Sequence, residues 1–176
     1  DEKIFKLIKF RSMTCETDEN GKLLPDDQRL TKYGKALRET SLDELPELIN
    51  ILKGDMSIIG PRPLLVRDMV FMTDEQRKRH TVRPGLSGLA QVNGRNAIQW
   101  ENKLNFDLEY IENITFVGDM KIIFQTVLKV LKHEDISEEG METAEDFGDY
   151  LLREGKVTPA EYDEKQEESK KLLNTF

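Results

Sequence analysis

Apolar side chains in the middle of the chain recur at the spacing of one helix face. They stand at positions i, i+3, i+4 and i+7, which are Leu45, Leu48, Ile49 and Leu52. This pattern predicts an amphipathic helix over residues 42–53. Gly54 follows directly and is placed to end the helix, because glycine readily adopts the left-handed conformation found after a helix C-terminus.

Other stretches of the chain are expected to form short strands or helices. A run of β-branched and aromatic residues without helix caps predicts a strand at residues 3–12. A short strand is expected at residues 57–59, stopped by Gly60-Pro61-Arg62-Pro63, and another at residues 89–92 within a glycine-punctuated loop. Residues 30–40 are expected to form a short helix or a turn, and another helix is expected to begin near Thr73. Apolar spacing predicts further helices at residues 97–112 and from 118 to about Lys132. The last stretch predicts two helices joined at Gly155, the second starting at the capping box Thr158-Pro159-Ala160-Glu161.

These elements predict an α/β fold, a single helix-dominated domain with a small sheet of short strands and a helical C-terminal extension. We expect the domain at residues 1–133 and the extension at residues 134–176, because the composition changes after His133. The extension holds 14 acidic and 5 basic side chains, whereas residues 1–133 hold 20 and 21. The formal net charge of −8 therefore comes from the extension.

Composition excludes several classes of protein. No run approaches the 18 apolar residues that a plain membrane-spanning helix needs. Cys15 is the single cysteine, so no disulfide framework can form within the chain and a reducing, cytosolic setting fits best. The two histidines are far apart in the sequence, which argues against a zinc site. The first 133 residues lack the basic field of a nucleic-acid-binding protein, so we expect no nucleic-acid partner.

Two adjacent carboxylates, Asp43 and Glu44, have two interpretations. Ser41-x-x-Glu44 is a capping-box pattern, and a helix N-terminus favours anions, so the pair can be a helix cap. Pro46 argues for more than a cap, because a proline inside a helix removes a hydrogen bond and bends the helix. Such a bend would turn both carboxylates toward a pocket.

Four arginines lie in or beside turn-rich segments: Arg38, Arg62, Arg83 and Arg95. Guanidinium groups bind phosphate oxygens through two parallel hydrogen bonds. Together with the carboxylate pair, they favour a site for an anionic ligand. The alternative for each arginine is a solvated surface position.

Several long motifs occur in one order: "KIFKLIKFRSM", "LRETSLDELPELINILKGDMSIIGPRPLL", "RHTVRPGLSGLAQVNGRNAIQWENK" and "FDLEYIENITFVGDMKIIFQTVLKVL". From Lys3 to Lys132 they resemble the bacterial sugar transferases of the monotopic phosphoglycosyl transferase family. The resemblance implies an enzyme that transfers a phospho-sugar from a UDP-sugar to a polyprenol phosphate and releases UMP, with Mg²⁺ as cofactor. This would be the first membrane step of glycoconjugate or polysaccharide assembly in a bacterium.

The resemblance also implies roles for particular residues. Asp43 would be the nucleophile that forms a covalent phospho-sugar intermediate, and it would also ligate the metal. Glu44 would assist with the metal or with proton transfer. Further side chains are expected to contact the phosphates, the metal or the nucleotide: Arg38, Arg62, Arg95 and Asp119.

Members of this family carry an N-terminal hydrophobic segment that enters the cytoplasmic membrane leaflet and returns. This sequence begins without one, so the resemblance implies a catalytic domain cut from its anchor, soluble by itself, that acts at the cytoplasmic face of the inner membrane. Residues 121–132 alternate lysines with apolar residues, a pattern that suits either the membrane interface or a core-facing helix. The C-terminal helices are expected either to mediate self-association or to pack on their own domain.

Three other functions remain open from the sequence. A non-catalytic module of a glycan-assembly complex would bind a UDP-sugar without forming an adduct. A hydrolase would turn over UDP-sugars with water in place of the lipid. A structural protein would use Asp43 and Glu44 only as a helix cap.

Overall fold

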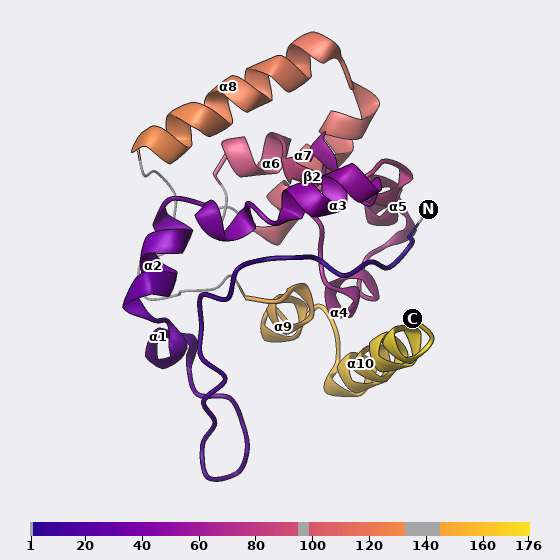
Figure 1. The fold of residues 1–176 in the computed structure, drawn as a ribbon. Coiled ribbons are helices and arrows are strands. Elements are labelled where there is room, and N and C mark those ends of the chain that lie inside the picture. The colour runs from indigo at the N-terminus through magenta and orange to yellow at the C-terminus, as the bar shows by residue number, and fades with distance from the viewer. Residues whose placement is uncertain (1, 95–98, 133–144) are drawn as a thin grey trace.

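The computed structural model describes residues 2–94, 99–132 and 145–176. In chain order its elements are α1 (Asp26–Arg29), α2 (Lys32–Glu39), η1 (Leu42–Glu44), α3 (Glu47–Lys53), β1 (Ser57–Ile59), α4 (Val66–Met69), α5 (Asp74–Arg77), η2 (Lys78–Thr81), β2 (Gly85–Ser87), α6 (Leu89–Val92), α7 (Trp100–Glu112), α8 (Phe116–Lys132), α9 (Phe147–Arg153) and α10 (Pro159–Asn174). Helices dominate and the sheet is small, as the sequence predicts (Figure 1).

The sheet consists of two short parallel strands, β1 and β2, with Ser57 opposite Gly85 and Ile59 opposite Ser87. Immediately after β1 the backbone of Gly60 passes very close to the next segment. A Cβ on this residue would lie 2.5 Å from the carbonyl oxygen of Arg83, so only glycine fits. Helix α8 covers the strands, and its Ile122 packs in a buried cluster with Ile59, Val92 and Tyr110.

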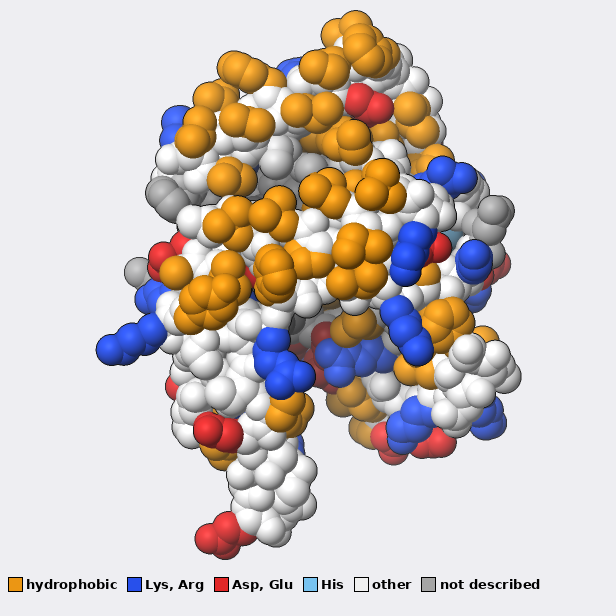
Figure 2. Space-filling model, in the orientation of Figure 1, with side chains coloured by type: hydrophobic (Ala, Val, Ile, Leu, Met, Phe, Trp, Pro, Cys, Tyr) orange, Lys and Arg blue, Asp and Glu red, His pale blue; other side chains and the backbone are white. Residues whose placement is uncertain are grey.

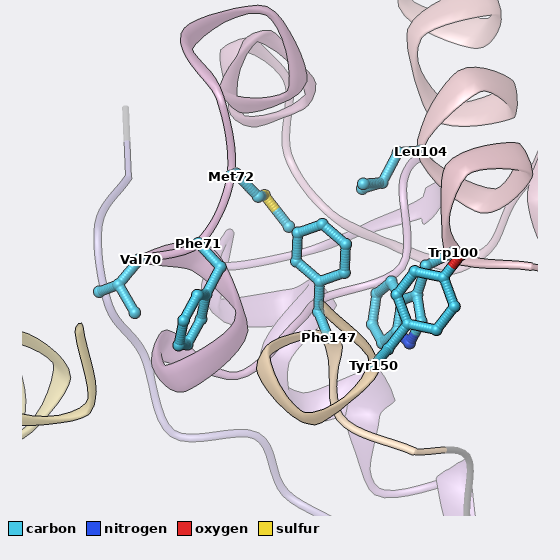
Figure 3. Packing of buried hydrophobic residues seen from close by; sticks show 7 residues of the cluster. All are labelled: Val70, Phe71, Met72, Trp100, Leu104, Phe147 and Tyr150. Carbon is cyan, nitrogen blue, oxygen red and sulfur yellow. The ribbon is translucent and has the colours of Figure 1, made fainter. Parts of the chain in front are cut away.

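A second buried cluster joins the segment that follows α4 to α7 and α9 (Figure 3). Its residues are Val70, Phe71, Met72, Trp100, Leu104, Phe147 and Tyr150. The ring centroids of Trp100 and Phe147 lie 5.1 Å apart. Two of these aromatic residues therefore come from the C-terminal extension and fill the core of the preceding chain.

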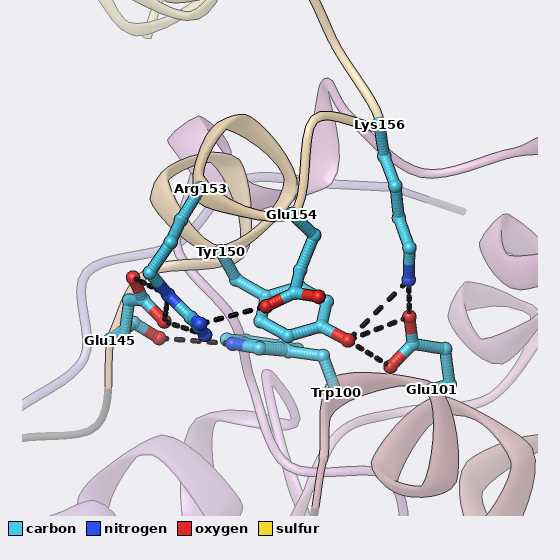
Figure 4. A network of polar contacts seen from close by, with 7 residues as sticks. All are labelled: Trp100, Glu101, Glu145, Tyr150, Arg153, Glu154 and Lys156. Atoms are coloured by element: carbon cyan, nitrogen blue, oxygen red, sulfur yellow. Dashed lines mark hydrogen bonds and ion pairs between the residues drawn. The ribbon is translucent and has the colours of Figure 1, made fainter.

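Polar contacts fasten the extension beside this cluster. The buried Asp68 carboxylate accepts a hydrogen bond from the backbone N–H of Phe147 (2.9 Å). The Tyr150 hydroxyl donates to the Glu101 carboxylate (2.7 Å), which also pairs with Lys156 (Figure 4). The Trp100 indole N–H donates to the carbonyl of Glu145 (3.0 Å). This hydrogen bond joins the start of α7 to the segment just before α9.

The predicted strand at residues 3–12 is wrong. This segment is extended, but in the described chain it forms no regular strand. A side chain takes the place of a neighbouring strand: the Asn50 amide accepts from Ile8 N (3.1 Å) and donates to Lys6 O (2.9 Å). The segment thus runs beneath α3 as a strap (Figure 1), and the buried Asn50 fastens it at Lys6 and Ile8.

The predicted strand at residues 89–92 is also wrong, because these residues form helix α6 and the strand lies just before them, at Gly85–Ser87. The single helix expected at residues 42–53 is divided instead. Pro46 separates the 3-10 turn η1 from α3, as expected from its missing N–H. Gly54 ends α3 in the left-handed conformation (φ 82°), as predicted.

The other helix predictions are confirmed where the chain is described. Helix α2 starts at its cap Thr31, and the capping boxes at Thr73 and Thr158 are both formed. Gly155 adopts a positive φ of 67° between α9 and α10. The helix expected at residues 97–112 is described from Trp100 onward.

Large apolar side chains are exposed along α3 and α8. Leu52 is 87% exposed and Phe116 is 80% exposed, and apolar side chains of α3 and α8 gather on one face (Figure 2). The opposite side of α8 is core, since Ile122 is buried. Within the described ranges, none of the helices has the length and apolar character required to cross a membrane.

Candidate active site

The carboxylate pair lies in the 3-10 turn η1, directly after an unusual residue. Ser41 adopts a left-handed backbone conformation (φ 54°) and its side chain accepts no capping hydrogen bond. The capping box expected between Ser41 and Glu44 is therefore not formed. A non-glycine residue with positive φ costs on the order of 1 kcal/mol or more, and such strain is often found at functional sites.

Glu44 is the centre of an ion-pair cluster. Its Oε1 accepts a short hydrogen bond from Arg62 and lies 3.1 Å from Lys9 Nζ. Burial would raise the pKa of Glu44, but the charges and hydrogen bonds of Arg62 and Lys9 outweigh it and lower the pKa to about 2. Glu44 is therefore ionised at neutral pH and pairs with the positively charged side chains of Arg62 and Lys9.

Lys9 also pairs with a third carboxylate, Glu47, which is almost fully buried (Nζ to Oε1, 3.1 Å). Burial raises the pKa of Glu47, and the positive charge of Lys9 opposes this shift. Lys9 comes from the strap formed by residues 3–12. Lys9 is not among the residues predicted from the sequence, because it lies 35 positions from Glu44 and no local pattern links the two.

Asp43 has a different environment from its neighbour. Within the described ranges its carboxylate forms no ion pair, whereas Glu44 forms two. Burial and the adjacent charge of Glu44 raise the pKa of Asp43, and Lys9 and Arg38 oppose the shift. Its backbone carbonyl accepts a hydrogen bond from Phe10 N (3.0 Å), which ties η1 to the strap. Asp43 is thus the carboxylate left available to a ligand.

The arginines expected at the site differ in position. Arg62 contacts the Glu44 carboxylate directly, as described above. Arg38 lies on α2, close enough to lower the pKa of Asp43, and its Nε donates to Ser12 Oγ (3.0 Å). Arg83 lies at an exposed position before β2. Arg95 lies outside the described residues.

Asp119 lies in the first turn of α8 and contacts the sheet through a tyrosine. The Tyr110 hydroxyl donates to Asp119 Oδ1 (3.0 Å) and approaches the carbonyl oxygen of Ile59 (3.4 Å). Burial and the hydrogen bond to Asp119 raise the pKa of Tyr110 to about 12. Asp119 is thereby linked to the end of β1, from which the chain continues to Arg62.

A cavity of about 200 Å³ opens beside Glu44, between η1, the two strands and α8. Its walls are mostly apolar side chains, including Leu45, Ile58 and Val127. Among the described residues, no group of three or more side chains forms a ready-made metal site. The arrangement offers one available carboxylate, a cationic surround and an apolar pocket.

Comparison with known proteins decides the family. The family model for bacterial sugar transferases matches residues 1–133. The chain belongs to this family. The match covers η1, both strands and the segments that supply Lys9, Arg62 and Asp119.

Three curated relatives illustrate the similarity. The uncharacterized sugar transferase EpsL of Bacillus subtilis is 52% identical over 82% of this chain and 72% of its own length. The undecaprenyl-phosphate galactose phosphotransferase of Salmonella typhimurium is 37% identical over 75% of this chain. The UDP-glucose:undecaprenyl-phosphate glucose-1-phosphate transferase of Escherichia coli is 43% identical over 73%. The aligned part spans only 31% and 30% of the last two relatives.

Proposed function

We propose that this chain is the catalytic part of a phosphoglycosyl transferase that moves a sugar phosphate from a UDP-sugar to a polyprenol phosphate. The observation that carries the proposal is the asymmetry of the carboxylate pair. Glu44 is occupied by Arg62 and Lys9, while Asp43 is partly desolvated and forms no ion pair with any residue that the structure describes. The named substrates of two relatives are of this chemical class.

The proposed reaction has two displacement steps at one phosphorus atom. An Asp43 oxygen attacks the phosphorus that bears the sugar, and the bond from this phosphorus to the bridging oxygen breaks, so UMP leaves with that oxygen. A phosphate oxygen of the polyprenol phosphate then attacks the same phosphorus and releases the Asp43 carboxylate. Phosphoryl transfer depends mainly on positioning and on neutralisation of charge, which Arg62, Lys9 and Arg38 are placed to supply.

Glu44 is better suited to organising cations than to moving protons. A carboxyl with a pKa of about 2 holds no proton at neutral pH and is a weak base. We therefore assign it the role of fixing Arg62 and Lys9 beside Asp43. This narrows the role expected from the resemblance, in which Glu44 assists the metal or a proton transfer.

Mg²⁺ fits the donor set of the site. This ion binds oxygen ligands, keeps several waters and is commonly held by one or two carboxylates together with substrate phosphates. Asp43 would supply the carboxylate, and the diphosphate of the donor would supply the rest. When bound, the ion would offset negative charge on the phosphates.

The exposed apolar faces of α3 and α8 are proposed to lie against the membrane that holds the lipid acceptor. Leu52 and Phe116 project from these faces, and Lys121, Lys129 and Lys132 lie along α8. Apolar contact combined with basic side chains favours an anionic membrane surface. Flotation with vesicles of phosphatidylglycerol and phosphatidylcholine tests this: we expect Leu52→Glu to reduce binding, and equal binding by the variant would contradict the assignment.

Intact-protein mass spectrometry tests the reaction. The chain is incubated with Mg²⁺ and a panel of UDP-sugars, with Asp43→Asn as the variant and the exposed Asp27→Asn as the matched control. We expect one phospho-sugar of added mass and release of UMP in the wild type and the control, and neither in Asp43→Asn. Binding of UDP-sugars without an adduct would indicate a nucleotide-binding module, and turnover to free products without lipid would indicate a hydrolase.

A further inference from the structure

A buried arginine outside the carboxylate cluster holds the loop that carries Arg62. Arg79 is 3% exposed and its partner Asp107 is 4% exposed. The Arg79 Nε and Nη2 atoms lie 2.9 Å and 2.7 Å from Asp107 Oδ2. The same Nη2 donates to the backbone carbonyl of Arg62 at 2.6 Å.

Two backbone hydrogen bonds to β2 hold the chain just before Arg62, at Gly60 and Pro61. The N–H of Gly85 donates to the carbonyl of Pro61 (2.9 Å), and the N–H of Gly60 donates to the carbonyl of Ser87 (3.0 Å). These bonds fix the start of the loop to β2. The carbonyl of Arg62 itself lies one residue further along, and Arg79 supplies its hydrogen bond.

We propose that Arg79, oriented by Asp107, is a positioning residue for the active site, which it affects by holding the backbone of Arg62 so that the Arg62 side chain meets Glu44. The inference rests on the proposed function. It connects α7 to η1 through four groups in sequence: the Asp107 carboxylate, the Arg79 guanidinium, the Arg62 backbone and the Glu44 carboxylate. Arg79 touches neither Asp43 nor Glu44 in any contact found among the described residues.

The geometry argues for more than a stabilising ion pair. A buried pair of charges contributes little net stability compared with apolar side chains of the same volume, because desolvation offsets the attraction. A guanidinium has a fixed planar fork, so one group can bind a carboxylate and a carbonyl at a defined angle. Arg79 uses its fork in this way, and the carbonyl that it holds belongs to a residue of the site.

The test variant is Arg79→Lys. Lysine keeps a positive charge opposite Asp107 but presents a single ammonium in place of the fork, so the bond to the Arg62 carbonyl is lost or displaced. The matched control is Arg29→Lys. Arg29 also combines a carboxylate partner, Asp26, with a backbone carbonyl, that of Leu24 (2.8 Å), but it holds a different loop.

The first measurement is the rate of adduct formation at Asp43 with saturating UDP-sugar and Mg²⁺. We expect Arg79→Lys to lower this rate on the order of 10- to 100-fold, since a small displacement of a positioning group has effects of this size. Arg29→Lys should stay within about twofold of the wild type. In the background of Arg62→Ala, adding Arg79→Lys should change the rate by less than twofold, because the side chain that Arg79 positions is already gone.

The second measurement does not depend on turnover. ¹⁵N relaxation of the Arg62 Nε–H group reports whether this side chain is held. We expect greater mobility in Arg79→Lys and no change in Arg29→Lys. Asp107→Glu, which keeps both charges and moves the fork, should give the same direction of change and serves if Arg79→Lys does not fold.

Several results would overturn the inference. They are an unchanged Arg62 mobility in Arg79→Lys, equal rate effects in the test and control variants, and a full additional rate loss on the Arg62→Ala background. A wild-type chain that forms no adduct counts against the proposed function alone. The relaxation measurement then still decides whether Arg79 holds Arg62.

Discussion

Substitution of Asn50 by aspartate tests how the strap of residues 3–12 is fastened. Asn50 is 1% exposed, and its Nδ2 donates to Lys6 O (2.9 Å) while its Oδ1 accepts from Ile8 N (3.1 Å). Asn50→Asp keeps the shape and the acceptor but removes the donor. It also places a carboxylate near Asp55, whose Oδ2 lies 3.4 Å from the present Nδ2.

The magnitude follows from these contacts. Loss of the hydrogen bond to Lys6 contributes about 1 kcal/mol. Burial of an uncompensated charge beside Asp55 adds about 2–4 kcal/mol at neutral pH. We therefore expect the free energy of unfolding to fall by about 3–5 kcal/mol at pH 7, a large part of the total stability of a typical domain.

The sign of the pH dependence is also fixed. Burial and the neighbouring Asp55 raise the folded-state pKa of the introduced carboxyl above its unfolded value of about 3.9. The folded variant therefore gains protons first as the pH falls, and the protonated acid can again donate to the Lys6 carbonyl. The stability difference from the wild type should shrink between pH 7 and pH 4.

Urea denaturation at several pH values measures this difference, with the m-value as a check that the transition stays cooperative. The matched control is Asn105→Asp, an exposed position on α7 where we expect a change within about 0.5 kcal/mol. A deficit below about 1 kcal/mol at pH 7, or one that does not shrink at lower pH, would refute the anchoring role of Asn50.

Two further predictions concern the loop and the core. Gly60→Ala should destabilise the protein by about 1–3 kcal/mol in denaturation experiments, because its Cβ would lie 2.5 Å from the Arg83 carbonyl oxygen; a neutral effect would show that the strands can separate. Burial raises the pKa of Asp68 to about 6, so the folded state binds this proton more tightly than the unfolded state does. The free energy of unfolding should therefore fall as the pH rises from about 4 to 6. Asp68→Asn still accepts from Phe147 N, and its stability relative to the wild type should increase by about 1–3 kcal/mol across that range; a constant difference would contradict the raised pKa.

Local sequence signals were sufficient for most helices. Apolar spacing identifies α8 and a capping box identifies α10, because the residues that form each signal lie within a few positions of each other. Pro46 is likewise a local signal for the break between η1 and α3, because a proline lacks the N–H that a continuous helix needs. The carboxylates of the site could be named from their adjacency and from the family resemblance, and their roles stay predictions.

The misassigned segments depend on contacts that no local pattern contains. Residues 3–12 have strand-like composition, but the partner that they meet is the Asn50 side chain, more than 40 positions away. Lys9 and Arg79 reach their carboxylates across 35 and 28 positions. Residues 89–92 are mostly apolar and too short for a period to show, so they suit a strand or a helix equally.

The place of Phe147 and Tyr150 in the aromatic cluster affects how the protein is made. These side chains lie beyond residue 133, where the match to the family ends, yet they pack against Phe71 and Trp100 from within that match. A growing chain therefore emerges from the ribosome with most of its family-specific sequence complete and this cluster still open. The cluster can close only after Phe147 and Tyr150 have been synthesised, so until then this apolar surface must remain shielded or risk association with other chains.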